Sequence, residues 1–313
     1  MKMKIAIYGT GGVGGYFGGR LAQAGADVAF IARGEHLRAI RENGLNVESI
    51  KGNFRIHPAF ATDQLREIGP VDAVLIAVKA WQVPEVAASL GPLVGPQTFV
   101  VPLENGVEAV DQLTSELGKE RVVGGLCKII SFIAAPGKIK HAGAEPFIAF
   151  GELDHKKSER TEKLLQTFES VGVLAKIPED IHAAIWEKFL FIASISGIGA
   201  IARAPIGVVR SIPEIREMLR SAMLEIYNIA IAKGILLPES IVEKTMGYVE
   251  NLPYEGTASM QRDIVDGKPS ELESQNGAVV RFGKELKVPT PVHSFIYNSL
   301  LPSELKARGK LKW

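Results

Sequence analysis

A glycine-rich run near the N-terminus constrains the fold more than any other stretch of this chain. The run YGTGGVGGYFGG overlaps the end of the short apolar stretch KIAIYG and places Gly9, Gly11 and Gly14 in G-x-G-x-x-G spacing. Glycine permits a tight turn and lets the backbone approach a pyrophosphate, which the free N–H groups of the next helix can bind. Because the run leaves a strand and opens a helix, it predicts a dinucleotide-binding turn rather than a purely structural one. The residues expected to line the cofactor are Gly9, Gly11, Gly12, Val13 and Gly14.

Strand-like and helix-like segments alternate through the first half of the chain. Strands are predicted at KIAIYG, DVAFIAR, AVLIAVKA and TFVVPLENG, with further strand-like runs at RVVGGLCKIISFIAAPGKIKHAG and PFIAFGEL. Helices are predicted at GGYFGGRLAQAG, GEHLRAIRENG, VPEVAASLGPLV and KSERTEKLLQTFESVG, and Gly25 and Gly44 close the first two. This alternation predicts an α/β fold with a doubly wound parallel sheet, the Rossmann arrangement that the glycine turn also indicates.

The pattern becomes almost entirely helical after about Pro178. The segment DIHAAIWEKFLFIASISGIGAI begins at Asp180, a plausible N-cap. The segment PEIREMLRSAMLEIYNIAIAK has Pro213 in its first turn and Gly234 just past its end. We therefore predict a dinucleotide-binding domain over residues 1–178 and an all-α domain over residues 179–313, which would carry the substrate-binding and catalytic residues.

The composition excludes several classes of function. The 313 residues are 46% hydrophobic and 23% charged, as in soluble globular proteins. The 36 basic and 35 acidic residues leave a net charge of +1, so charge does not favour binding to nucleic acid. The single cysteine, Cys127, cannot form an internal disulfide, and we expect a reducing, cytoplasmic setting. The histidines show no metal-ligand spacing, so we expect no metal site.

We also expect no membrane-spanning helix. The best apolar candidate, residues 181–197, is interrupted by Glu187 and Lys188. The N-terminal run MKMKIAIYGTGG has too short an apolar part for a signal peptide, and a buried strand explains it better. The long apolar helices of the second half could pack together within one chain or cover the surface of a homodimer, and the sequence does not decide between these.

Residues at predicted strand ends indicate which dinucleotide binds. NAD-binding sheets place an acidic residue at the end of the second strand, where it holds the ribose 2′-hydroxyl. Here FIARGEH places Arg33 at that point, and a guanidinium suits the 2′-phosphate of NADP(H). The alternative is a solvated arginine, and the nearby Glu35 weakens the preference. Lys79 and Asn105 follow the next two strands, which predicts a cation and an amide on the rim where the nicotinamide should lie.

One lysine occupies the middle of the most apolar predicted helix. In IHAAIWEKFLFIASISG the helical neighbours of Lys188 are all apolar, namely Ala184, Ile185, Phe191 and Ile192. A buried ammonium is costly, so the ordinary explanation is a packed stem whose charged end reaches water. The alternative is a functional ammonium that is directed into a ligand site.

Several short motifs of this chain follow one another in the same order as in a known protein family. They are IYGTGGVGGYFGGRLAQAG, ARGEHLRAIRENGL, VKAWQ, ENGV, WEKF, ASMQRDI and SELESQNGAVV, and they run through nearly the whole chain. In these stretches the sequence resembles the ketopantoate reductase (2-dehydropantoate 2-reductase) family. The resemblance implies a Rossmann domain, a helical domain and an active site in the cleft between them. It also implies NADPH-dependent reduction of a 2-keto acid to a 2-hydroxy acid, in the pathway to pantothenate.

The resemblance also assigns roles to single residues. The catalytic lysine of the family corresponds to Lys188, which would act as the general acid that protonates the ketone oxygen after hydride transfer. The other corresponding residues are Ser259 and Glu271 for the substrate, Asn105 for substrate and cofactor, and Arg33 and Lys79 for the cofactor. On pattern alone, Glu271 is better explained as a solvated carboxylate at a helix start, and Ser259 equally well as an N-cap.

The chain departs from the family at three positions near the predicted substrate. The family carries amides four and eight residues after the catalytic lysine, where this chain has Ile192 and Ser196, and an asparagine where it has Ile206. Hydride transfer does not need these amides, but they would orient a hydroxylated substrate. The sequence therefore supports reduction of a keto acid more strongly than it supports ketopantoate as the substrate, although ketopantoate is still the leading substrate. The alternatives are a reductase for a less polar keto acid and a non-catalytic NADPH-binding protein.

Overall fold

The computed structural model describes residues 2–143 and 145–313, and the chain forms two compact units. The N-terminal unit comprises Met1–Glu104 and Ala109–Ile181, and the C-terminal unit comprises Asn105–Glu108 and His182–Trp313. The segment Asn105–Glu108 thus belongs to the helical unit although it lies within the first half of the sequence, which no local pattern indicated. A domain boundary at residue 178 remains a prediction from sequence.

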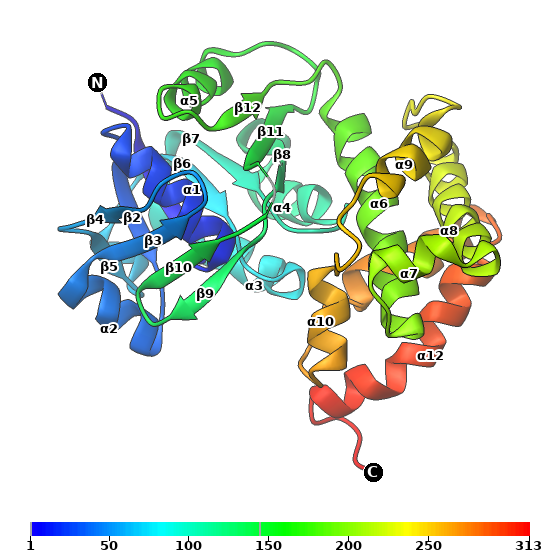
Figure 1. Cartoon of the computed structure of the whole chain (residues 1–313). Helices are drawn as coiled ribbons and strands as arrows, with labels where there is room; N and C mark the ends of the chain where they lie inside the picture. Colours follow the sequence, from blue (N-terminus) through cyan, green and yellow to red (C-terminus); the bar gives the residue numbers. More distant parts are fainter. Residues whose placement is uncertain (1, 144) are drawn as a thin grey trace. The chain divides into compact units, whose positions relative to one another are not determined.

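A five-stranded parallel sheet forms the centre of the N-terminal unit (Figure 1). Its strands, in spatial order, are β5 (Phe60–Thr62), β2 (Asp27–Ile31), β1 (Lys4–Tyr8), β6 (Val71–Ile76) and β7 (Val94–Pro102). All four neighbouring pairs are parallel, which confirms the predicted α/β fold. Ile5, Ile7 and Phe30 are fully buried, because helices and neighbouring strands cover the sheet. The helices between the strands are α1 (Gly12–Gln23), α2 (Gly34–Asn43), α3 (Val83–Ser89) and α4 (Ala109–Leu117), with short 3₁₀ turns η1 (Leu65–Glu67), η2 (Ala80–Gln82), η3 (Gly91–Leu93) and η4 (Lys119–Arg121).

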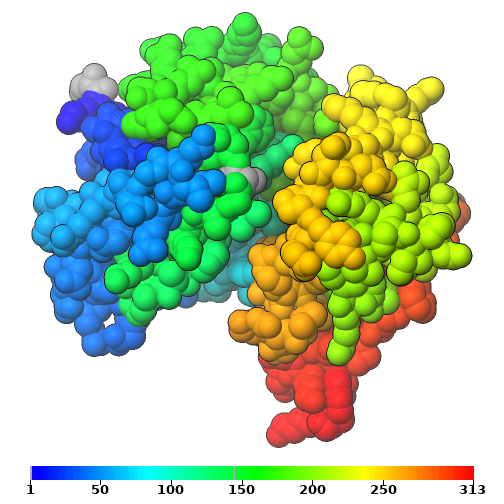
Figure 2. Space-filling model, in the orientation of Figure 1, coloured from blue at the N-terminus to red at the C-terminus, as the bar shows by residue number. Residues whose placement is uncertain are grey.

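Two smaller sheets extend the N-terminal unit beyond the predicted parallel sheet. One contains β4 (Phe54–Ile56), β3 (Leu45–Ser49), β10 (Lys138–His141) and β9 (Ser131–Ala135), and the other β12 (Leu174–Lys176), β11 (Phe147–Glu152) and β8 (Val123–Lys128). Figure 2 shows residues 45–56 beside residues 131–141 at the surface, as the parallel pairing of β3 with β10 requires. The sequence did not predict β3, β4, β5 and β12. Three of these strands are three residues long, too short for a periodic pattern, and β3 alternates only weakly.

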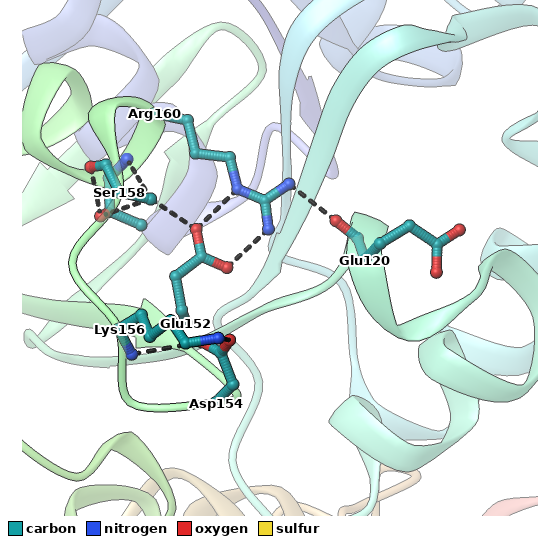
Figure 3. Close-up of polar contacts among 7 residues, drawn as sticks. Glu120, Glu152, Asp154, Lys156, Ser158 and Arg160 are labelled. Atoms are coloured by element: carbon teal, nitrogen blue, oxygen red, sulfur yellow. Dashed lines mark hydrogen bonds and ion pairs between the residues drawn. The ribbon is translucent and has the colours of Figure 1, made fainter.

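A carboxylate–guanidinium pair joins three segments of the N-terminal unit (Figure 3). Arg160, in α5 (Glu159–Glu169), donates from Nε and Nη2 to the two carboxylate oxygens of Glu152 at 2.6 and 2.5 Å. Its Nη1 donates to the carbonyl oxygen of Glu120 at 2.7 Å. Ser158, the N-cap of α5, donates from Oγ to Glu152 at 2.5 Å. The pair therefore links the end of β11, the start of α5 and the turn η4.

Helices build the C-terminal unit (Figure 1). They are α6 (Ile181–Ala202), α7 (Ile206–Ser211), α8 (Pro213–Ala232), α9 (Ile241–Glu250), α10 (Ser259–Val265), the π-helical turn η5 (Glu273–Gly277), α11 (Ala278–Leu286) and α12 (Pro291–Ala307). Their core includes Phe189, Leu190, Met223 and Ile226, which are at most 1% exposed. Helix α8 begins at Pro213 and Gly234 follows its end with φ +79°, as predicted.

Helix α6 differs from one sequence expectation. We expected Glu187 and Lys188 to exclude a membrane span, yet by length and composition α6 could cross a membrane. In the structure, 61% of its most apolar window is buried inside the protein. The apolar character of α6 is therefore explained by its packing as a core helix of the C-terminal unit.

Candidate functional site

The glycine turn lies where the strand order of the parallel sheet reverses. β1 has β2 on one side and β6 on the other, and the remaining strands continue outward in both directions. In open α/β sheets, ligands bind beyond the carboxyl ends of the strands at such a point. The turn after β1 and the loop after β6, which carries Lys79, both leave carboxyl ends there. The topology thus makes this edge the candidate cofactor site of the N-terminal unit.

The structure gives a separate physical explanation for glycine at each of four positions in the turn. Gly9 has φ +96°, which permits the sharp turn after β1. A Cβ at Gly14 would collide with the carbonyl oxygen of Gly9, so this glycine lets α1 begin close behind the turn. A Cβ at Gly12 would collide with Ser131 of β9, so packing also demands this glycine. A Cβ at Gly11 would meet no described atom within 4 Å, which leaves the backbone there open to a ligand.

The first turn of α1 suits an anion. The helix begins at Gly12, followed by Val13 and Gly14, and among the described residues no side chain caps it and no acidic residue stands in its first turn. Its first N–H groups have no partner within the helix, and the helix dipole favours negative charge beside them. These residues therefore fit the pyrophosphate of a dinucleotide, and contact with it remains a prediction.

His36 braces this turn, a role that the sequence did not reveal. Its Nδ1 accepts a hydrogen bond from the backbone N–H of Gly137 at 3.0 Å, so the proton lies on Nε2, which donates to the carbonyl oxygen of Thr10 at 2.7 Å. Burial lowers the pKa of His36, which favours this neutral form.

Across residues 2–143 and 145–313, no group of three or more His, Cys, Asp or Glu side chains could hold a metal ion.

Arg33 lies at the position expected for a 2′-phosphate ligand. It follows β2 as the N-cap residue of α2 and is exposed. Within the described part of the N-terminal unit, its guanidinium makes no hydrogen bond or ion pair. Glu35 instead pairs with Arg38 at 3.0 Å. The acidic residue that could weaken a preference for NADP(H) is therefore held by another arginine.

Lys79 is half-buried in the loop that follows β6. Its backbone N–H donates to Oε1 of Gln82 at 3.1 Å, and its Nζ lies 5.9 Å from the centre of the Trp81 ring. The neighbouring loop contains Glu104, whose Oε1 accepts a hydrogen bond from the N–H of Val78 at 3.2 Å. This carboxylate, 9% exposed, links the loops after β6 and β7, and the sequence did not single it out.

Asn105 and Glu271, which are 166 residues apart in sequence, meet in the C-terminal unit. Asn105 donates from Nδ2 to Oε2 of Glu271 at 3.3 Å, and Gln275 donates to the same oxygen at 3.4 Å. Glu271 is only 4% exposed, so its explanation as a solvated carboxylate at a helix start is wrong. Asn105 was expected on the Rossmann side, whereas the structure groups it with the helical unit.

Lys188 lies on the less buried side of α6. Its side chain is half-buried, as are Ala184, Phe191 and Ile192, while Phe189 and Ala193 face the core. Within the described residues of the C-terminal unit, its ammonium makes no hydrogen bond or ion pair. Its stem is therefore packed while its charge is not neutralised by a neighbouring carboxylate of this unit.

Ser259 is the first residue of α10 and is half-buried. The N-cap position falls on Ala258, whose N–H donates to Oε1 of Gln261 at 3.3 Å. Gln261 also donates to the carbonyl oxygen of Ala204 at 2.9 Å, which connects α10 to the chain after α6. The alternative N-cap role of Ser259 therefore falls to its neighbour.

The three positions at which this sequence lacks the amides of the family have different surroundings in the structure. Ser196 is fully buried in α6, and Ile206 is 6% exposed at the start of α7. Ile192 is half-buried one turn after Lys188. Of the three, Ile192 therefore places an apolar side chain beside the candidate catalytic lysine.

Family models match both units. The model described as "Ketopantoate reductase PanE/ApbA" matches residues 5–155, and "Ketopantoate reductase PanE/ApbA C terminal" matches residues 180–303. The chain belongs to the ketopantoate reductase family. This confirms the resemblance that the sequence motifs indicated.

Relatives of the family agree in sequence and fold. The chain is 31% identical over 298 residues to the uncharacterized oxidoreductase YkpB of Bacillus subtilis, covering 95% of this chain and 98% of YkpB. It is 30% identical over 310 residues to 2-dehydropantoate 2-reductase of Mesorhizobium japonicum, covering 92% and 94% of the two chains. The crystal structure of the PanE/ApbA family ketopantoate reductase from Ralstonia eutropha JMP134 matches with a TM-score of 0.89 and 28% identity, covering 98% of this chain and 100% of that one. As a ketopantoate reductase family member, the chain is an oxidoreductase that uses a nicotinamide cofactor and acts on a small-molecule keto acid.

Proposed function

We propose that this chain uses NADPH to reduce 2-dehydropantoate (ketopantoate) to pantoate, in pantothenate biosynthesis in the cytoplasm. The observation that carries the proposal is the contact between Asn105 and Glu271. These residues come from separate family-like motifs. Asn105 holds the buried carboxylate of Glu271, which can accept a hydrogen bond from a substrate hydroxyl.

The proposed chemistry assigns one task to each residue. NADPH, when bound, supplies the hydride. Hydride transfer leaves negative charge on the ketone oxygen, and the ammonium of Lys188 protonates that oxygen. Glu271 accepts a hydrogen bond from the substrate hydroxyl, with Asn105 holding the carboxylate. Ser259 donates a hydrogen bond to the substrate carboxylate.

Replacing the proposed acid tests the mechanism. General acid catalysis contributes about 10²- to 10⁴-fold in rate, so Lys188→Ala should lower kcat by about that factor. The affinity for NADPH should change little, because the cofactor residues that we propose lie elsewhere. Rates of NADPH oxidation, with fluorescence titration of NADPH, provide both measurements. Lys244→Ala is the matched control, because Lys244 is an exposed lysine of the same unit, paired with Glu187 at 3.3 Å. Near-normal turnover of Lys188→Ala would exclude the acid role.

A second candidate is a reductase for a less polar keto acid, favoured by Ile192 beside Lys188. A panel of 2-keto acids, with and without a hydroxyl group, separates the two by kcat/KM. Highest kcat/KM with ketopantoate supports the first candidate, and highest kcat/KM with an apolar keto acid supports the second. Tight binding of NADPH without turnover of any keto acid would instead indicate a non-catalytic binding protein.

A further inference from the structure

Every backbone and side-chain polar group of Ser270, the residue before Glu271, is bound. Its N–H donates to both carboxylate oxygens of Glu304 at 3.1 Å, and its Oγ donates to Oε2 of Glu304 at 2.5 Å. Its carbonyl oxygen accepts a hydrogen bond from Nη2 of Arg308 at 2.9 Å, and its Oγ accepts one from the N–H of Leu272 at 3.2 Å. The backbone that enters Glu271 therefore has little freedom to rotate.

Glu304 and Arg308, which together form a clamp on Ser270, are joined to each other by an ion pair. Arg308 donates from Nε to Oε1 of Glu304 at 2.6 Å, and both residues come from the C-terminal end of α12 or just beyond it. Ser270 is fully buried, and the side chain of Glu304 is 5% exposed. A carboxylate buried to this degree needs charge-assisted hydrogen bonds, which are short and directional.

The chain that leaves Glu271 is also fixed. Its carbonyl oxygen accepts hydrogen bonds from the N–H of Gln275 at 3.0 Å and from Oγ of Ser274 at 3.2 Å. The N–H of Gly277 reaches back to the carbonyl oxygen of Leu272 at 2.9 Å, which forms the π-helical turn η5. Such turns frequently occur at functional sites.

We propose that Glu304 and Arg308 are positioning residues that direct the carboxylate of Glu271 toward the substrate. The proposal rests on the proposed substrate-binding role of Glu271. Neither residue touches the substrate; they act through Ser270. A displacement of about 1 Å in a binding group can lower kcat/KM by up to about a hundredfold, so loosening these contacts should measurably weaken binding of the keto acid.

Glu304→Gln tests the proposal, because the amide keeps the volume but provides one acceptor oxygen instead of two. We expect the KM for the keto acid to rise about tenfold, with kcat changed less than about threefold and the KM for NADPH unchanged. Arg308→Lys keeps a cation near Glu304 but cannot hold both Glu304 and the carbonyl oxygen of Ser270. It should raise the same KM by a smaller factor, and its partly exposed side chain makes folding failure a lesser concern.

Two controls separate positioning from stability. Ile296→Val shortens a fully buried side chain of α12 and should lower the melting temperature while leaving the KM for the keto acid unchanged. Glu250→Gln breaks a surface pair with Arg216, of 2.9 Å, and should change neither quantity. If Ile296→Val raised that KM as much as Glu304→Gln at equal loss of melting temperature, the clamp would be only structural.

A double variant provides the decisive measurement. If Glu304 acts through Glu271, then Glu304→Gln should have no further effect on the KM for the keto acid in a Glu271→Gln background. A tenfold rise in both backgrounds would overturn the proposal, and so would an unchanged KM in Glu304→Gln itself. The Kd of ketopantoate for the chain loaded with NADP⁺ is a parallel readout that needs no turnover. Binding without turnover would refute the proposed reduction and still decide the positioning role, whereas absence of any keto-acid binding would refute both.

Discussion

Arg160→Met should destabilise the N-terminal unit by about 2–3 kcal/mol. The guanidinium makes two hydrogen bonds to Glu152 and one to the carbonyl oxygen of Glu120, and the Glu152 side chain is only 10% exposed. Removing one partner of a buried ion pair costs about 3–5 kcal/mol, because the other charge is left away from water. Since the Arg160 side chain is 29% exposed, water would partly replace it, and we reduce the expected cost to about 2–3 kcal/mol. Methionine retains an apolar stem near the ring of Phe99.

Thermal unfolding followed by circular dichroism measures this loss. For a unit of this size, about 2–3 kcal/mol corresponds to a fall in Tm of about 4–12 °C. Arg38→Met is the control, because Arg38 pairs with Glu35 in the same unit at 3.0 Å with both side chains well exposed, and its loss should stay below about 1 kcal/mol. Equal losses for the two variants would refute the argument that burial of Glu152 sets the magnitude.

Three further predictions follow from the candidate site and its surroundings. Arg33→Ala should raise the KM for NADPH about tenfold to a hundredfold and leave the KM for NADH unchanged, since hydrogen bonds to charged groups contribute about 1.5–3 kcal/mol; equal changes for both cofactors in steady-state assays would contradict it. Burial lowers the pKa of His293 to about 4 in the folded protein, whereas the unfolded chain binds this proton near pH 6.5. The contribution of neutral His293 to the free energy of unfolding should therefore be full above pH 6.5 and fall by up to about 3 kcal/mol as the pH drops toward 4. Urea titrations at several pH values should find a smaller pH dependence in His293→Gln. Ile192→Asn should raise kcat/KM for ketopantoate about tenfold relative to the same keto acid without its hydroxyl group, and an unchanged ratio would mean that Ile192 does not contact the substrate.

The glycine turn could be predicted from sequence because its requirements are local. Gly9 needs a positive φ, and Gly14 needs space beside the carbonyl oxygen of Gly9, five positions earlier. The continuous apolar run of β1 is equally local. The turn, α1 and the parallel sheet were therefore predicted, and the structure confirms the fold.

The buried carboxylate of the C-terminal unit could not be predicted in this way. The residues next to Glu271 read as an ordinary helix start, and nothing in them indicates burial. Glu271 is held by Asn105, 166 residues away, and through Ser270 by Glu304, which lies 34 residues after Ser270. Only the family resemblance singled out Glu271, and no pattern at all indicated Glu304. Contacts between distant segments decide this part of the site, and periodicity contains no information about them.

The segment Asn105–Glu108 makes the two units inseparable by a single cut. The chain crosses between units after residues 104, 108 and 181. Arg281 of α11 binds the segment Asn105–Glu108, because its Nη2 lies 2.9 Å from Oε2 of Glu108. A fragment that starts at residue 182 would lack its own Asn105, and a fragment that ends at residue 181 would carry a loop whose partners are missing. Recombination at the obvious boundary would therefore exchange helical units without the amide that binds Glu271. Chimaeras of this family should instead carry residues 105–108 together with the helices from residue 182 onward.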